Sequence, residues 1–239
     1  MNAEKKTYPV NIRGELTVPP GPGWWLLKWL LGIPHYVILF FLWIAFIFVC
    51  IIAFFAILFT GKYPKSLFQF NEGVLRWSWR VCFYSYGALA TDKYPPFSLE
   101  PDHDYPADLE VAYPEKLSSG LVLVKWWLLA IPHYIVVGIF TGALSWGWGS
   151  RNGPESGDNV SAWGWGFNSD WGTNGDWNGG GIGLIFILAI FAGVVLLFTS
   201  KYPQEIFRLV VGFNRWSIRV AAYASLMTDQ YPPFRLWDD

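Results

Sequence analysis

The sequence predicts an all-α integral membrane protein built from two tandem repeats, with a minor β-strand element at the membrane surface. Its 239 residues are 53% hydrophobic, 20% aromatic and only 15% charged, a composition that is hard to pack as a soluble globule. Residues 29–61 contain no Asp, Glu, Lys or Arg, and an apolar run of this length predicts a membrane helix. Several short strings also occur twice in the same order, which indicates an internal repeat.

The repeated strings divide the chain into two units, residues 1–100 and 101–239. The matching pairs are LLGIPHY (30–36) and LLAIPHY (128–134), LFTGKYP (58–64) and LFTSKYP (197–203), RWSWR (76–80) and RWSIR (215–219), and TDKYPPF (91–97) and TDQYPPF (228–234). Tyr8-Pro9 and Tyr105-Pro106 open the two units in the same way. Because every pair keeps its place in the order, we expect both units to share one architecture.

These strings resemble the bacterial membrane proteins of domain-of-unknown-function family 4389. The patterns L-F-T-G-K-Y-P, R-W-S-x-R and T-D-x-Y-P-P-F-x-L carry the resemblance, which covers nearly the whole chain. The resemblance implies a membrane architecture in a bacterial cell membrane, and it implies no particular activity.

A short extended segment opens each repeat, at residues 8–18 and 105–112. Alternating apolar and polar residues in these segments favour a strand over a helix. Residues 97–99 and 234–236 are the ends of the two TDxYPPFxL strings. If both repeats cross the membrane alike, all four segments meet on the outer face as a small sheet.

An amphipathic lead-in follows each strand, at residues 24–31 and 121–130. Each lead-in carries a lysine whose apolar stem can lie along lipid while its ammonium group stays wet, so we expect it at the membrane interface. Pro34 and Pro132 then mark a bend or a helix start, since proline is tolerated in the first helical turn but not in the interior.

The membrane helix of the first repeat is expected at residues 34–59. Its length of roughly 39 Å, at 1.5 Å per residue, exceeds the hydrocarbon core and allows tilt. In the second repeat an insertion at about 145–181, rich in Gly, Trp, Asn and Asp, is too polar for hydrocarbon and predicts an aqueous loop. Residues 182–199 after it are just long enough to span, whereas residues 133–144 before it are not.

A helix with a polar stripe follows each membrane helix. The stripes are Gln69, Glu72, Arg76 and Arg80 in the first repeat, and Glu205, Arg208, Gly212, Arg215 and Arg219 in the second. Steps of three and four place each set on one helix face. The favoured interpretation puts these helices in the interface with their arginines toward lipid phosphates, and the alternative puts the stripe inside the bundle, where charges mark a pathway or ligand site. The candidate contacts to lipid headgroups or anions are Arg76, Arg80, Arg208, Arg215 and Arg219.

The charge distribution favours one orientation. Residues 61–80 and 200–219 hold eight Lys and Arg against two acids, whereas the remainder holds nine against sixteen. The positive-inside rule therefore places these segments in the cytoplasm and the inserted loop outside. The tryptophans of that loop alternate with Gly, Asn and Asp, a composition that can stack on sugar rings. The candidate outer-loop contacts are Trp163, Trp165, Trp171 and Trp177.

No catalytic constellation is found in the sequence, so we expect neither an enzyme nor a cofactor. His35 and His133 recur at matching positions without a Cys or acidic partner at ligand spacing, which favours helix-start histidines at the interface over a metal site. Residues 179–183 lack the Lys-Ser/Thr of a phosphate loop, and the net charge of −1 gives no sign of nucleic-acid binding.

Three functional classes are compatible with these features. The first is an accessory or scaffolding subunit of a membrane complex, whose partners are the lipid bilayer, anionic lipids and other membrane-protein subunits. The second is a small transporter or channel with an arginine-lined path between the repeats. The third is an outer-face ligand or glycan binder that acts through the Trp-rich loop. We rank them in this order.

Overall fold

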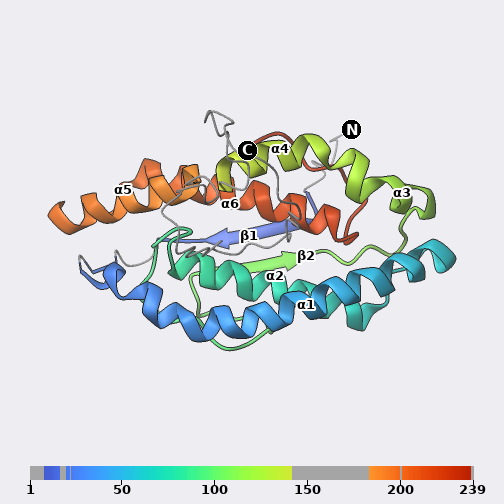
Figure 1. The fold of residues 1–239 in the computed structure, drawn as a ribbon, viewed down its shortest axis with the longest axis horizontal. Coiled ribbons are helices and arrows are strands. Elements are labelled where there is room, and N and C mark those ends of the chain that lie inside the picture. Colours follow the sequence, from blue (N-terminus) through green and yellow to red (C-terminus); the bar gives the residue numbers. More distant parts are fainter. Residues whose placement is uncertain (1–7, 17–19, 22, 142–182, 200, 238–239) are drawn as a thin grey trace, which may run out of the picture.

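The computed structural model describes residues 8–16, 20–21, 23–141, 183–199 and 201–237. Over these residues the chain is mostly helical, with one long apolar helix and a small two-stranded sheet (Figure 1). The insertion predicted at about 145–181 lies outside the described residues, and so do its tryptophans Trp163, Trp165, Trp171 and Trp177.

Helices along both long edges enclose the sheet. In chain order the elements are β1 (Val10–Gly14), the 3-10 turn η1 (Trp24–Leu26), α1 (Lys28–Thr60), α2 (Lys65–Tyr84), β2 (Ala107–Val111), α3 (Ser119–Val124), the π-helix η2 (Lys125–Leu129), α4 (Ile131–Thr141), α5 (Leu184–Thr199) and α6 (Gln204–Ala224). Figure 1 shows α1 along one edge and α4 and α5 along the opposite edge, with the sheet, α2 and α6 between them.

The helix α1 is 33 residues long, or about 50 Å at 1.5 Å per residue. Among the described helices it is the one long and apolar enough to cross a membrane. Its buried residues form a narrow stripe: Lys28, Gly32, His35, Leu39, Phe46, Ala53 and Ile57. Most other large apolar side chains of α1 are exposed to the surroundings of the protein. The described apolar helix of the second half, α5, has 16 residues and is shorter than the spanning segment expected there.

The predicted boundary at Pro34 is wrong, because α1 begins at Lys28 and runs through the proline. The lead-in at residues 24–31 therefore forms the 3-10 turn η1 and the first turn of α1. The Lys28 ammonium is buried and donates to Thr91 O at 2.7 Å, which fixes this turn against the chain after α2. Lysines at the interface were expected to stay wet, and Lys28 and Lys125 are both buried instead.

A π-helix keeps the two lysines equivalent despite a one-residue insertion. Lys28 lies six residues before Pro34, whereas Lys125 lies seven residues before Pro132. The π-helix η2 accommodates the extra residue, since its turns contain more residues than those of an α-helix. Lys125 consequently donates to Thr228 O at 2.7 Å, the same contact that Lys28 makes at the matching threonine.

The two strands predicted at the repeat openings form one antiparallel sheet, in which Val10 pairs with Val111 and Ile12 with Leu109. The hydrogen bond that Ala112 N donates to Pro9 O shows which residue pairs of the sheet are hydrogen-bonded and which are not. Leu109 and Val111 belong to the non-hydrogen-bonded pairs, so their backbone N–H and C=O groups point away from β1.

Residues 97–99 and 234–236 are not strands, so the predicted four-segment sheet is wrong in this part. Each segment follows two prolines, which lack the N–H donors that a ladder requires. Phe97 instead stacks on the His35 ring, with 4.0 Å between the ring centroids.

Each strand packs on the helices of the other sequence-matched half. The Tyr8 hydroxyl donates to Gln230 O at 3.1 Å, and the Tyr105 hydroxyl donates to Lys93 O at 3.3 Å, two contacts at matching positions. The residues that lead into the first strand therefore contact the last described segment of the chain, residues 201–237. This exchange interlocks the two halves around the sheet.

Candidate functional site

The polar stripe of α2 faces the interior of the protein. Pro64 precedes the helix as its extended N-cap, and the stripe then lies against β2. Arg76 is 6% exposed and Arg80 is fully buried. The structure thus turns both guanidinium groups inward, in contrast to the favoured interpretation that they face lipid phosphates. In the second half, Arg219 is also buried, Arg215 is half-buried and Arg208 is exposed.

Glu72 and Arg76 cap the free edge of β2. Arg76 Nε donates to Leu109 O at 2.7 Å, and Glu72 Oε1 accepts from Val111 N at 3.0 Å. A 2.7 Å ion pair joins Arg76 Nη2 to the same carboxylate oxygen. Arg76 Nη1 also donates to Leu99 O at 2.9 Å. The pair therefore satisfies the backbone groups that a third strand would otherwise engage.

Arg80 anchors the chain that follows α2. Its Nη2 lies 2.9 Å from Asp108 Oδ1, and its Nη1 donates to Glu100 O at 2.9 Å. Burial lowers the pKa of Arg80, and the Asp108 carboxylate opposes this shift. Burial likewise raises the pKa of Glu72, against the opposing effects of the Val111 N–H and of Arg76. These buried charges are paired, as the cost of desolvation requires.

The equivalent place on α6 lacks the carboxylates of this cluster. Val211 stands at the position that matches Glu72, and Asn11 stands at the position that matches Asp108. The Arg219 guanidinium lies over the Tyr8 ring, 5.2 Å from its centroid. The acidic members of the cluster are therefore specific to the site on α2, which Asp108 reaches from the second half of the sequence.

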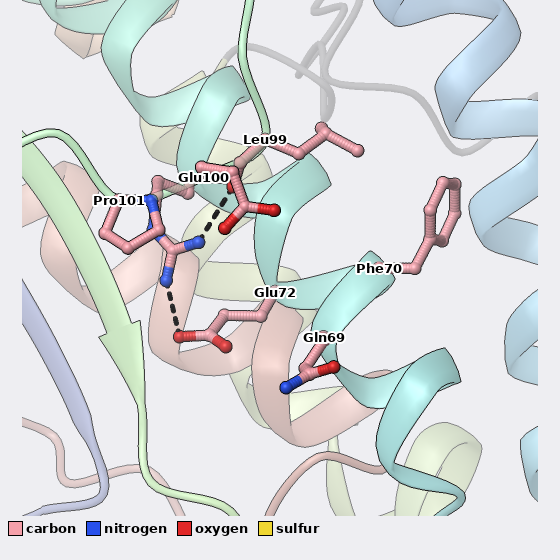
Figure 2. A pocket seen from close by; sticks show the side chains of 7 residues that line it. Gln69, Phe70, Glu72, Leu99, Glu100 and Pro101 are labelled. Atoms are coloured by element: carbon pink, nitrogen blue, oxygen red, sulfur yellow. Dashed lines mark hydrogen bonds and ion pairs between the residues drawn. The ribbon is translucent and has the colours of Figure 1, made fainter.

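A pocket of about 370 Å³ opens beside this cluster, which is within the size range of small-molecule sites. Its lining residues are Gln69, Phe70, Glu72, Arg76, Leu99, Glu100 and Pro101. Figure 2 shows the carboxylates of Glu72 and Glu100 and the Gln69 amide along the same side of α2. The pocket thus combines oxygen acceptors with apolar walls.

Two buried histidines join the repeated strings to one another. Trp77 Nε1 donates to His35 Nδ1 at 3.1 Å, and Trp216 Nε1 donates to His133 Nδ1 at 3.2 Å. Because Nδ1 accepts a hydrogen bond, each neutral ring carries its proton on Nε2. Both side chains are fully buried inside the protein, and His133 lies in the first turn of α4, as expected of a histidine at a helix start. Within the described part of the chain, no cluster of three or more metal-ligating side chains occurs.

Sequence reasoning found the stripes and the histidines but missed their partners. The residues it missed are Leu99, Glu100 and Asp108 around the arginines and Phe97 on His35. The TDxYPPFxL strings carried the available signal, because a proline-rich segment that recurs with an aromatic residue predicts a fixed packing partner.

These features define a mostly helical protein whose two sequence-matched halves share one sheet and bury a charge-paired cluster. The sequence profile of one family, Domain of unknown function (DUF4389), matches residues 24–98 and 182–235. The two regions make up more than half of the chain and are consistent with two tandem copies, and the protein belongs to this family. Comparisons with curated proteins and with solved structures gave no match.

Proposed function

We propose that the protein consists of two copies of one membrane-embedded unit and serves as an accessory or scaffolding subunit of a complex in the bacterial plasma membrane. The exposed apolar surface of α1 and α5 carries the proposal. Phe59 is 80% exposed and Phe198 is 82% exposed, and both helices present further large apolar side chains along their length. In water, exposed apolar area costs about 25 cal/mol per Å², and large apolar patches mark membrane or protein contacts.

The length of α1 is compatible with a tilted position in the bilayer. A hydrocarbon core is about 30 Å thick, so a helix of about 50 Å exceeds it and accommodates by tilting. The apolar faces of α1 and α5 then contact lipid, and their remaining area is available to other membrane-protein subunits.

The interior contacts favour a structural role over transport. The guanidinium groups of Arg76 and Arg80 already donate to four backbone carbonyls and bind two carboxylates. An anion moving along these arginines would have to displace contacts that hold β2 in place. The transporter is therefore the second candidate, and the outer-face glycan binder is the third.

Site-specific photo-crosslinking in intact bacteria tests the proposal. A photoreactive amino acid replaces exposed Phe41 or Phe48 in α1, and buried Phe46 serves as the matched internal control. The proposal expects the protein to stay in the membrane after alkaline carbonate extraction. It also expects one protein partner to be crosslinked from the exposed positions only. Release by carbonate contradicts the membrane assignment, and crosslinks to lipid alone contradict the subunit assignment.

A further inference from the structure

We propose that the pocket beside α2 binds a small organic monocation with N–H donors, namely a primary ammonium or guanidinium group. The ligand class is independent of the scaffolding role, because it follows from the pocket itself.

Two carboxylates offer free acceptors to this pocket. Glu72 binds Arg76 and the Val111 N–H through one oxygen, Oε1. Within the described residues, no donor reaches Glu72 Oε2, and the Glu100 carboxylate has no ion-pair partner. A primary ammonium group has three donors on one charged centre and matches such a set of oxygens.

The charges around the pocket leave room for one cation. The charged side chains that line the pocket are the Glu72 and Glu100 carboxylates and the Arg76 guanidinium, so the lining carries one more negative than positive charge. Burying or crowding like charges is unfavourable, and a bound monocation would balance them. An anion would meet these carboxylates and would find Arg76 already engaged.

In the second half, the side chain of an arginine occupies the place that is equivalent to this pocket. Arg208 matches Gln69, and Trp237 matches Glu100. The Arg208 guanidinium lies over the Trp237 ring, 5.6 Å from its centroid. The first half does not have this covering pair, and it has Glu72 where the second half has Val211. A ligand cation in the first half would therefore occupy the side of the helix that Arg208 covers in the second.

The apolar walls of the pocket favour a ligand whose charged group is attached to a short alkyl chain. Phe70, Leu99 and Pro101 line the pocket together with the acceptors. A free alkylamine and the ethanolamine headgroup of a lipid both present an ammonium group on a short carbon chain. They share the chemistry that the pocket recognises and differ only in their source.

Ligand binding to the full chain in amine-free detergent micelles tests the proposal. The probes are n-butylammonium chloride and dihexanoyl phosphatidylethanolamine, with n-butanol and dihexanoyl phosphatidylcholine as controls that lack N–H donors on a cation. The readouts are the melting temperature and saturation-transfer NMR of the probe. We expect at least one ammonium probe to bind and both controls to fail.

A variant that copies the second half supplies the matched test. Gln69→Arg combined with Glu100→Trp should fold, because the chain uses this pair at the equivalent place, and it should weaken binding at least about tenfold. The exposed substitution Glu100→Gln should weaken binding less, and Glu115→Gln, away from the pocket lining, should not change it. Binding of butylammonium assigns a free amine, and binding of the lipid alone assigns the headgroup. Failure of both probes, or binding unchanged in the double variant, overturns the proposal.

Discussion

The indole Nε1 of Trp77 donates a hydrogen bond of 3.1 Å to Nδ1 of His35, in a place where neither side chain reaches solvent. His35 belongs to the first repeated string and Trp77 to the third, and Phe97 of the fourth string stacks on the histidine. The second half repeats the arrangement with His133, Trp216 and Phe234. The recurring strings are thus held together by one recurring contact.

The first prediction concerns this contact. Trp77→Phe removes the donor and leaves His35 Nδ1 buried without a partner, which should destabilise the protein by about 1–3 kcal/mol. Adding His35→Phe removes the orphaned acceptor as well, so the double variant should lose less stability than the sum of the single variants. Chemical unfolding in detergent measures both. Additive losses would contradict a direct bond between the two side chains.

The second prediction concerns the close approach of the chain to α2. A Cβ added at Gly73 would lie 2.7 Å from Leu99 Cβ and 3.0 Å from Leu99 O, so Gly73→Ala should cost about 1–3 kcal/mol. At Gly212 the corresponding distances to Leu236 are 3.2 and 3.3 Å, and the cost should be smaller. Gly120→Ala is the control, because nothing lies within 4 Å of its added Cβ. Equal melting temperatures for all three variants would contradict close packing of Leu99 on Gly73.

The third prediction concerns pH. Burial raises the pKa of Glu72 above its ordinary value of 4.5, so the folded state binds this proton more tightly than the unfolded state. The contribution of Glu72 to stability is therefore greatest below its ordinary pKa and declines as the pH rises through the raised value. Glu72→Gln removes this titration. The melting temperature of the wild type relative to this variant should fall as the pH rises above about 4.5, and a constant or rising difference would contradict this prediction.

The fourth prediction concerns the exposed face of α1. Phe48→Lys places a charge in the middle of the apolar helix, where insertion scales give a cost of about 2.5–3.5 kcal/mol. Phe59→Lys lies next to the helix end, where a lysine reaches water more easily, and it should cost less. The amount of protein in carbonate-washed membranes measures the difference. Equal amounts for the two variants would count against a lipid environment around Phe48.

Much of the fold was predictable from local patterns. The apolar run predicted α1, alternation predicted β1 and β2, and steps of three and four predicted the polar faces of α2 and α6. Pro34 predicted a start six residues too late, because α1 continues through the proline to Lys28. The first turn of α1 is held by the hydrogen bond from Lys28 to Thr91 O. Because Thr91 lies far along the chain, the local sequence pattern around Lys28 does not predict this contact.

The site was less predictable than the fold. Periodicity placed the arginines on one face but left open whether that face meets lipid or protein. The answer depends on Leu99, Glu100 and Asp108, which come from a loop and a strand after the helix. Their approach is set by tertiary packing, including the glycine at position 73, and a single sequence does not reveal such long-range geometry.

The most direct test of the central claim is the accessibility of spin labels on α1 in liposomes. Phe41→Cys, Phe48→Cys and Phe55→Cys lie on the exposed face, and they are labelled in a background in which Ala replaces Cys50 and Cys82. If this face is embedded, collision with apolar oxygen will be high and collision with a water-soluble nickel chelate will be low at all three positions. High accessibility to the nickel chelate at these positions would contradict a membrane-embedded α1 and the function proposed from it.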